Sequence, residues 1–394
     1  MVTFSIQHRQ DPGEARVGVL ETPHGVIETP TFMPVGSLGV VKGIDPEELH
    51  RCGFGLMLSN AYHLYLRPGH ALIAGQGGLH KFSGWSGAIL TDSGGFQMVS
   101  LSGLCQVKED GVEFASHLDG SRHHLTPELC IETQLALGSD IMMVLDECPP
   151  YPCSPEQARD AVHRTTRWAQ RCRMASQGVS NGLFGIVQGG VDKDLRCRSA
   201  RDLVDIGFDG YALGGLSLGE AKPMMFEMIE TTVAELPKDR PRYLMGVGMP
   251  EDLVEGVCRG VDMFDCVLPS RHGRTGWLFT STGRVLIKQA QYARDESPID
   301  PHCKCTVCQR FSRAYLRHLF VSNEMLGCRL NTLHNLWYYG TLMAELRAAI
   351  QANQLQAYCS AFYAKRQRAS VTRSAEGRAS SDDLSQKHAT VVSA

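Results

Sequence analysis

A single carboxylate stands within a short apolar segment, residues 263–268, whose composition favours a buried strand. The carboxylate is Asp265, and the segment breaks at Pro269 into a polar stretch, residues 270–274, that we expect to be a flexible loop. An acid inside a strand is costly unless it is paired or used, because burial disfavours its ionised form. Two arginines in the polar stretch could hold a polyanion beside the carboxylate. The alternative is a solvated acid with ordinary surface arginines.

Three thiols fall within six residues, at Cys303, Cys305 and Cys308. At this spacing they can all face one Zn²⁺, whose tetrahedral preference leaves a fourth position. The candidates for that position are His302, His318 and His334, of which the last lies in a helix-like stretch that could fold back over the thiols. A site closed by four protein ligands is structural, so we expect no catalysis by this metal. Reduced, buried cysteines without a metal are the alternative.

Further polar side chains and glycines follow other short apolar runs. They are Asp92, Ser93, Gly94, Gly95 and Phe96 after one run, Asp146, Gln188, and then Gly215 and Leu216 after three more, and Met245 at the end of another. The carboxylate and the amide could meet the edge of a planar heterocycle, and the phenyl and thioether groups could cover its faces. The glycines would let a flat ligand reach the backbone. Each polar group alone could merely cap a helix, and no glycine-rich phosphate loop of the G-x-x-x-x-G-K-[ST] type is present.

The elements that must position these groups alternate along the chain. Eight short apolar runs occupy residues 31–35, 55–59, 88–91, 141–145, 183–187, 210–213, 242–245 and 263–268. Helix-start signals stand between several of them: Asp45-Pro46-Glu47, Thr126-Pro127-Glu128 and Ser154-Pro155-Glu156. Residues 192–204 and 222–236 also fit a helical period. Eight strand–helix repeats predict an α/β fold, a (β/α)8 TIM barrel with its chemistry at the carboxyl ends of the strands. A doubly wound open sheet is the alternative.

The two ends of the chain differ from this pattern. Residues 15–20 and 25–28 flank a turn and predict a β-hairpin that caps the barrel. Residues 365–394 are rich in Arg, Ser and Ala and have no apolar period, which predicts a disordered tail.

The overall composition is that of a globular protein of 394 residues, with 43% hydrophobic and 21% charged residues. No apolar run approaches the roughly 20 residues of a membrane-spanning helix, and the first ten residues have no signal-peptide core, so we expect a cytoplasmic protein. The 14 cysteines of so long a chain do not indicate a disulfide scaffold. The net charge is −3, yet residues 270–318 carry nine Lys or Arg against three Asp or Glu. This local charge of +6 favours contact with a polyanion.

The motifs together resemble the tRNA-guanine transglycosylases, also called queuine tRNA-ribosyltransferases. The resemblance covers nearly the whole chain, from residue 29 to His334. The matching blocks are T-D-S-G-G-F-Q at 91–97, D-E-C-P at 146–149, I-V-Q-G-G at 186–190, Y-A-L-G-G-L-S-L-G-E at 211–220, Y-L-M-G-V-G at 243–248, F-D-C-V-L-P-S-R-H-G-R at 264–274, and the C-x-C-x2-C set with its histidine. The family resemblance implies one barrel over residues 1–364, with a zinc-binding insertion at about 277–340.

The resemblance also implies a reaction and assigns roles. Guanine at the wobble position of a tRNA with a G-U-N anticodon is exchanged for a 7-deazaguanine base, a step of queuosine biosynthesis. Asp265 matches the nucleophile and Asp92 the acid/base. The positions that match base recognition are Asp92, Ser93, Gly94, Gly95, Asp146, Gln188, Gly215 and Leu216, with Phe96 and Met245 stacking on the base. A carboxylate can trap the positive charge that develops at the ribose C1′ when an N-glycosidic bond breaks.

Two loops match the RNA-contacting segments of the family. Their residues are Gly246, Val247, Gly248, Met249, Pro250, Glu251 and Asp252 in the first, and Ser270, Arg271, His272, Gly273 and Arg274 in the second. The resemblance further implies a structural zinc ion on Cys303, Cys305, Cys308 and His334, and a homodimer. Leu218 stands where queuine users of the family tend to have Gly, and its volume favours the smaller precursor preQ1. A queuine-inserting enzyme, a non-catalytic tRNA-binding relative and a zinc-dependent barrel hydrolase are the alternatives.

Overall fold

The computed structural model describes residues 2–96 and 105–367, which divide into two compact units. The first holds the described residues up to 271 together with 339–353, and the second holds 272–338 and 354–367. The predicted tail, residues 365–394, begins inside a helical segment, 355–367, and its remaining residues, 368–394, lie outside the described part of the chain, as does Gln97. No helix within the described ranges is long and apolar enough to cross a membrane.

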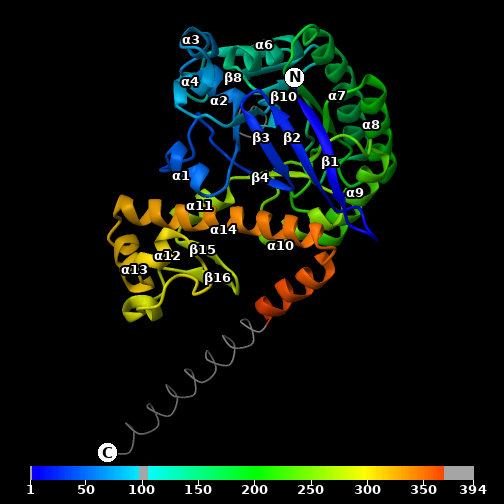
Figure 1. The fold of residues 1–394 in the computed structure, drawn as a ribbon. Coiled ribbons are helices and arrows are strands. Elements are labelled where there is room, and N and C mark those ends of the chain that lie inside the picture. The colour runs from blue at the N-terminus through cyan, green and yellow to red at the C-terminus, as the bar shows by residue number, and fades with distance from the viewer. Residues whose placement is uncertain (1, 97–104, 368–394) are drawn as a thin grey trace, which may run out of the picture. The chain divides into compact units, whose positions relative to one another are not determined.

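Eight parallel strands form the centre of the first unit (Figure 1). They are β4 (Thr31–Pro34), β5 (Leu56–Ser59), β6 (Ala88–Thr91), β10 (Ile141–Met143), β11 (Gly182–Val187), β12 (Gly210–Leu213), β13 (Arg242–Leu244) and β14 (Met263–Cys266). Their order is β4-β14-β13-β12-β11-β10-β6-β5, and a parallel bridge between Val35 and Leu58 joins the two edge strands. The last strand therefore pairs with the first. The predicted (β/α)8 barrel is confirmed, and the open doubly wound sheet is excluded.

Helices follow the strands and cover the outside of the barrel (Figure 1). The main ones are α1 (Pro46–Arg51), α6 (Pro127–Leu137), α7 (Pro155–Ala175), α8 (Lys193–Ile206), α9 (Lys222–Glu235) and α10 (Pro250–Cys258). The predicted start signals are confirmed, because Asp45, Thr126 and Ser154 each accept a hydrogen bond from the third residue of their helix. Three further short helices follow β5: α2 (Ala61–Leu66), α3 (His70–Gly75) and α4 (Gly78–Ser83).

Two antiparallel sheets are added to the barrel. The predicted hairpin is β2 (Arg16–Thr22) with β3 (Gly25–Thr29), and it gains a third strand, β1 (Thr3–Arg9), that the sequence did not predict. The strands β7 (Cys105–Val107), β8 (Val112–Ala115) and β9 (Arg122–Leu125) form another sheet, which was also not predicted. They are only three or four residues long, so they carry little periodic signal.

The predicted flexible loop at residues 270–274 is wrong. These residues lie in helix α11 (Leu268–Arg274), in which the Arg271 N–H donates to the Val267 carbonyl at 2.8 Å. Pro269 falls in the first turn of this helix, where its missing N–H costs nothing. A proline can end a strand or lie in the first turn of a helix, and the sequence-based prediction considered only the end of a strand.

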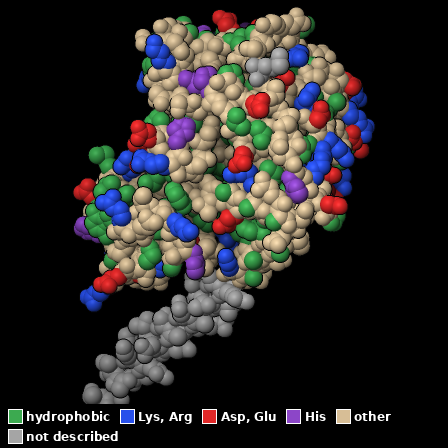
Figure 2. Space-filling view, in the orientation of Figure 1, with side chains coloured by type: hydrophobic (Ala, Val, Ile, Leu, Met, Phe, Trp, Pro, Cys, Tyr) green, Lys and Arg blue, Asp and Glu red, His purple; other side chains and the backbone are tan. Residues whose placement is uncertain are grey.

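The second unit surrounds a small apolar core of Leu278, Ile287, Ile299, Val307 and Leu316. Its elements are the hairpin β15 (Trp277–Thr280) and β16 (Gly283–Leu286), the 3-10 helix η1 (Ala290–Arg294), α12 (Thr306–Arg310), α13 (Arg313–Val321) and the first half of α14 (Met325–Gln351). Figure 2 shows acidic and basic side chains interspersed over the face that it presents. On this face, attraction for a polyanion must therefore come from local groups rather than from a uniform positive charge.

Candidate active site and metal-binding group

Asp265 lies in β14 and presents one carboxylate oxygen. Its Oδ1 accepts hydrogen bonds from the Tyr243 hydroxyl at 2.6 Å and from the Gly246 N–H at 2.8 Å. Within the described residues no hydrogen bond reaches Oδ2, and the side chain is only half-buried. Burial raises the pKa of Asp265, and the two hydrogen bonds act against that rise. The arrangement fixes Oδ1 and leaves Oδ2 without a donor among the described residues.

Asp92 follows β6 and is held by the N-terminus of helix α2. The Asn60 side-chain amide donates to Oδ2, and the Ala61 N–H donates to Oδ1 at 2.9 Å. The residue is 6% exposed. Both oxygens thus accept hydrogen bonds, which fixes the orientation of this carboxyl group. Burial, then the charge of Asp265 and the hydrogen bond to it, and then the charge of Asp92 raise the pKa of Tyr243.

Asp146 and Gln188 form a polar edge at the ends of β10 and β11. The Gln188 Nε2 donates to Asp146 Oδ2 at 2.7 Å, and the Ser93 hydroxyl donates to Oδ1 at 3.2 Å. Burial raises the pKa of Asp146 to about 6, despite these two hydrogen bonds. The Gln188 Oε1 is buried and has no partner among the described residues. An ionised Asp146 can accept only, so this edge fits a ligand edge with N–H donors.

Glycines bring the backbone of the next strand end against this edge. A Cβ on Gly214 would lie 2.7 Å from Gln188 Nε2, and a Cβ on Gly215 would lie 2.6 Å from Gln188 Oε1. No side chain fits at either position, and Gly215 also has a φ of 67°, which disfavours other residues. A cavity of about 360 Å³ adjoins Gly215 and Leu218, with Tyr151 and Cys153 among its walls. Of the predicted base-recognition residues, Gly215 therefore lines this cavity, and Gln188 lies directly beside Gly215.

The two predicted stacking residues differ in exposure. Phe96 is 50% exposed, which suits a ring that covers a ligand face, whereas Met245 is half-buried at the end of β13. Leu216 is buried. Because β14, β13, β12, β11, β10 and β6 are consecutive neighbours in a parallel barrel, all these side chains lie at the same end of it.

The predicted RNA-contacting residues are not all available to a ligand. In the first segment Val247, Gly248, Pro250 and Asp252 are buried, and Asp252 pairs with Lys222. Gly246 is exposed, and Met249 and Glu251 are half-buried. In the second segment Arg271 is exposed, His272 and Arg274 are half-buried, and Ser270 and Gly273 are buried. Arg271 is thus the most accessible cation of the two segments.

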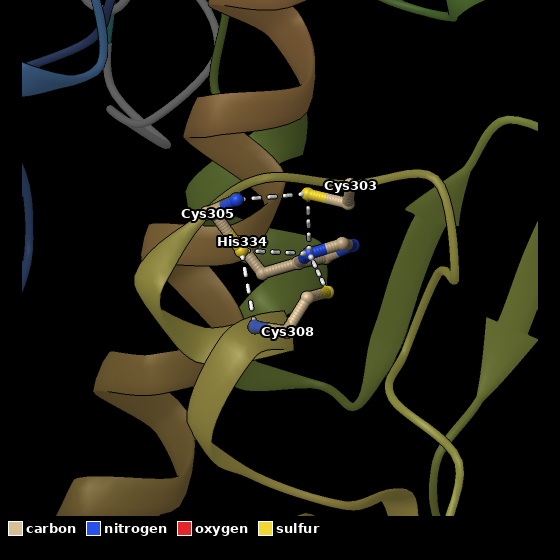
Figure 3. Close-up of side chains that lie close together, drawn as sticks. All are labelled: Cys303, Cys305, Cys308 and His334. Atoms are coloured by element: carbon tan, nitrogen blue, oxygen red, sulfur yellow. Dashed lines mark hydrogen bonds between the residues drawn. The ribbon is translucent and has the colours of Figure 1, made fainter.

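The three predicted thiols meet the predicted histidine in the second unit (Figure 3). The His334 Nδ1 lies 3.8 Å from the Cys303 Sγ, 3.5 Å from the Cys305 Sγ and 3.4 Å from the Cys308 Sγ. A tetrahedral cation with sulfur at about 2.3 Å and nitrogen at about 2.0 Å requires such edges to be about 3.5 Å. The His334 Nε2 donates to the Phe279 carbonyl at 2.8 Å, which leaves Nδ1 unprotonated for a metal. These four residues could together hold a metal ion, and His302 and His318 are not among them.

A second group with metal-ligand atoms lies at the other end of the barrel strands, where Asp140 precedes β10. His24 Nδ1 donates to Asp140 Oδ1 at 2.7 Å, and His80 Nε2 lies 3.1 Å from Oδ2. The two imidazole rings are stacked 3.6 Å apart at 15°. Parallel rings cannot both direct an in-plane lone pair at one ion, so this arrangement is a hydrogen-bonded cluster.

The sequence reading missed three residues that hold the site. Tyr243 and Asn60 bind the two carboxylates directly, and Glu220 accepts from the backbone N–H groups of Ser217 and Leu218. Tyr243 and Glu220 stand inside quoted motifs, but nothing in their types or spacing shows which group they contact. Asn60 follows the run 55–59 at a strand end, which is the one signal that could have identified it.

The chain is similar to known proteins over nearly its whole length. A family model described as queuine tRNA-ribosyltransferase matches residues 11–368. The chain is 56% identical over 366 residues to a queuine tRNA-ribosyltransferase of Pelotomaculum thermopropionicum, covering 93% of this chain and 99% of that protein. It is 53% identical over 364 residues to the protein of the same name from Halothermothrix orenii, covering 92% and 98%. With a family match over nearly its whole length and relatives above half identity, the chain belongs to the queuine tRNA-ribosyltransferase family.

Proposed function

We propose that this protein is an enzyme that exchanges guanine in tRNA for a 7-deazaguanine base, through a covalent intermediate on Asp265. The observation that carries the proposal is the asymmetry of this carboxylate. Two donors fix Oδ1, while Oδ2 is open on a half-buried side chain beside the base-recognition residues. A nucleophile held in one orientation is what displacement at C1′ requires.

The exchange balances without an energy-carrying cofactor. Oδ2 of Asp265 forms a bond to C1′ as the bond from C1′ to guanine N9 breaks, and the electron pair of that bond leaves with guanine. Asp92 in its protonated form supplies the proton to the departing base. As a carboxylate held by Asn60 and Ala61, it then takes the N9 proton of the incoming base, whose nitrogen attacks C1′ and frees Asp265. Both groups return to their starting states.

The polar edge suits guanine-type bases. Guanine presents two N–H donors beside a carbonyl oxygen, and an ionised Asp146 accepts from the donors, while Gln188 and the Gly215 N–H meet the oxygen. We propose preQ1 as the incoming base, since Leu218 narrows the cavity beside Gly215. Competition among guanine, preQ1 and queuine tests this choice, and Leu218→Gly should raise the relative use of queuine. An unchanged preference in that variant would place the selection elsewhere.

We further propose zinc as the metal held by Cys303, Cys305, Cys308 and His334. When bound, it would tie the thiol segment to helix α14, and four protein ligands leave no position for a substrate. The RNA partner is proposed to be a tRNA with a G-U-N anticodon, with its phosphates near Arg271, and the assembly a homodimer. Sedimentation of the protein with and without tRNA tests the assembly.

Two variants test the catalytic roles. Asp265→Asn should form no covalent adduct, because an amide cannot attack C1′, while Asp92→Asn should bind tRNA but exchange guanine about 10²–10⁴-fold more slowly. The measurement is a denaturing gel of protein mixed with tRNA, in which only a covalent bond retains a shifted band. A band from Asp265→Asn that is absent from Asp92→Asn would reverse the two roles. A band from neither variant, and none from the unmodified protein, would refute the covalent route.

A further inference from the structure

A fully buried guanidinium lies behind the base-recognition residues. Arg196 belongs to the first turn of α8 and is 0% exposed. Its Nε donates to the Gly190 carbonyl at 2.7 Å, and its Nη2 donates to the Gly214 carbonyl at 2.9 Å. These carbonyls belong to the loops after β11 and β12. One side chain therefore joins the two strand ends that carry Gln188 and Gly215.

The Gly214 carbonyl and the Gly215 N–H are the two ends of one peptide group. In a trans peptide they point in opposite directions, so a donor on the carbonyl side leaves the N–H facing away from Arg196. Hydrogen bonds in series polarise one another in surroundings of low dielectric. A cation on this carbonyl thus makes the Gly215 N–H a stronger donor towards the ligand side.

Burial of the charged Arg196 guanidinium costs free energy. Burial lowers the pKa of Arg196 to about 10, which still leaves the group charged at neutral pH. Its Nη1 is buried without a hydrogen-bond partner among the described residues, and the charge of Glu220 acts on Arg196 without a direct ion pair among those residues. A buried charge is expensive in free energy, and a neutral side chain could join two loops more cheaply. The charge itself is therefore the feature to be explained.

We infer that Arg196 is a positioning residue that sets and polarises the Gly214–Gly215 peptide, so that the Gly215 N–H binds the carbonyl oxygen at C6 of the base. This inference rests on the proposed function. Negative charge grows on that oxygen as the base leaves C1′, and a polarised N–H stabilises the growing charge more than the neutral base. Arg196 would then select bases that carry an oxygen at this position.

Two bases that differ at that position test the inference. Guanine has the oxygen and 2-aminopurine lacks it, so each is measured as a competitor of base exchange by the unmodified protein, Arg196→Met and Arg196→Lys. Arg196→Met should weaken the binding of guanine about 10- to 100-fold, which is the range of a hydrogen bond to a charged group. The affinity for 2-aminopurine should stay within about 2-fold of that of the unmodified protein. Arg196→Lys keeps the positive charge but cannot donate to both carbonyls in the same geometry, so its affinity for guanine should lie between those of the unmodified protein and Arg196→Met. Affinity for tRNA should change little in either variant.

A matched control is Arg242→Met. Arg242 is 1% exposed, has its pKa lowered to about 10 by burial and contacts the Gly260 carbonyl at the opposite end of the barrel strands. Arg242→Met should lower the stability of the protein without changing the ratio of its affinities for guanine and 2-aminopurine. If a folded Arg196 variant, Lys included, weakens both bases equally or neither, the inference is overturned. If the unmodified protein exchanges no guanine at all, the proposed function fails instead.

Discussion

Asp146→Asn is expected to stabilise the protein while it abolishes base recognition. Burial raises the pKa of this carboxyl group to about 6, against 3.8 for an exposed one. Well below pH 4 the group is protonated in both states; as the pH rises towards 6 the carboxyl group of the unfolded chain ionises first, so the free energy of unfolding falls. At 1.36 kcal/mol per pH unit the full loss is about 3 kcal/mol.

The asparagine variant has no such loss. Its new amide can donate to the Gln188 Oε1, which has no partner among the described residues, once the Gln188 amide turns over. We subtract about 1 kcal/mol for an imperfect replacement of the hydrogen bonds. The variant should then be about 2 kcal/mol more stable than the unmodified protein at pH 8 and about equally stable at pH 4.5. Exchange should fall at least about 10²-fold, because one amide oxygen cannot serve two N–H donors of guanine.

Urea denaturation at both pH values, beside guanine exchange at pH 8, measures these effects. Asp140→Asn is the control, because the hydrogen bonds from His80 and His24 outweigh burial and lower the pKa of Asp140. The ionised Asp140 therefore stabilises the folded protein at neutral pH, and this contribution is lost as the pH falls through its lowered pKa. Asp140→Asn should accordingly be destabilised at pH 8. An Asp146→Asn protein that is less stable at pH 8, or a gain that does not depend on pH, would refute the reasoning.

Three other predictions concern the remaining groups. Tyr243→Phe removes the 2.6 Å hydrogen bond to Asp265, so the pKa of Asp265 should rise further and the acidic limb of the pH–rate profile should move to higher pH, with the alkaline rate retained; an unmoved limb contradicts this. Cys303→Ser should lower the metal content and the stability of the protein, while the folded fraction keeps its specific activity. Complete loss of the metal with intact folding would exclude a structural role for it. Arg271→Ala should make the plot of the logarithm of the tRNA association constant against the logarithm of the salt concentration less steep by about one unit. Unchanged tRNA binding with weaker guanine binding would place this arginine in the base pocket instead.

The family and its barrel could be predicted because the signals are local. Each buried strand is a short apolar run, and Asp45, Thr126 and Ser154 mark helix starts by their own side chains and the prolines that follow. The positions of Asp92, Asp146 and Asp265 at strand ends then placed them at one end of the barrel. Local chemistry did not settle Pro269, since the same residue suits a loop and the first turn of α11.

The tertiary structure decided which groups touch. His302 lies next to the thiols in sequence, yet His334 completes the metal-binding group, because α14 carries its Nδ1 to within 3.8 Å of all three sulfur atoms. Tyr243 reaches Asp265 only because β13 and β14 are neighbours in parallel register, and Arg196 reaches Gly214 only because α8 packs behind two adjacent strands. Residue type determines what a side chain can do, but its partner depends on strand order, register and helix packing, which involve residues far apart in the chain.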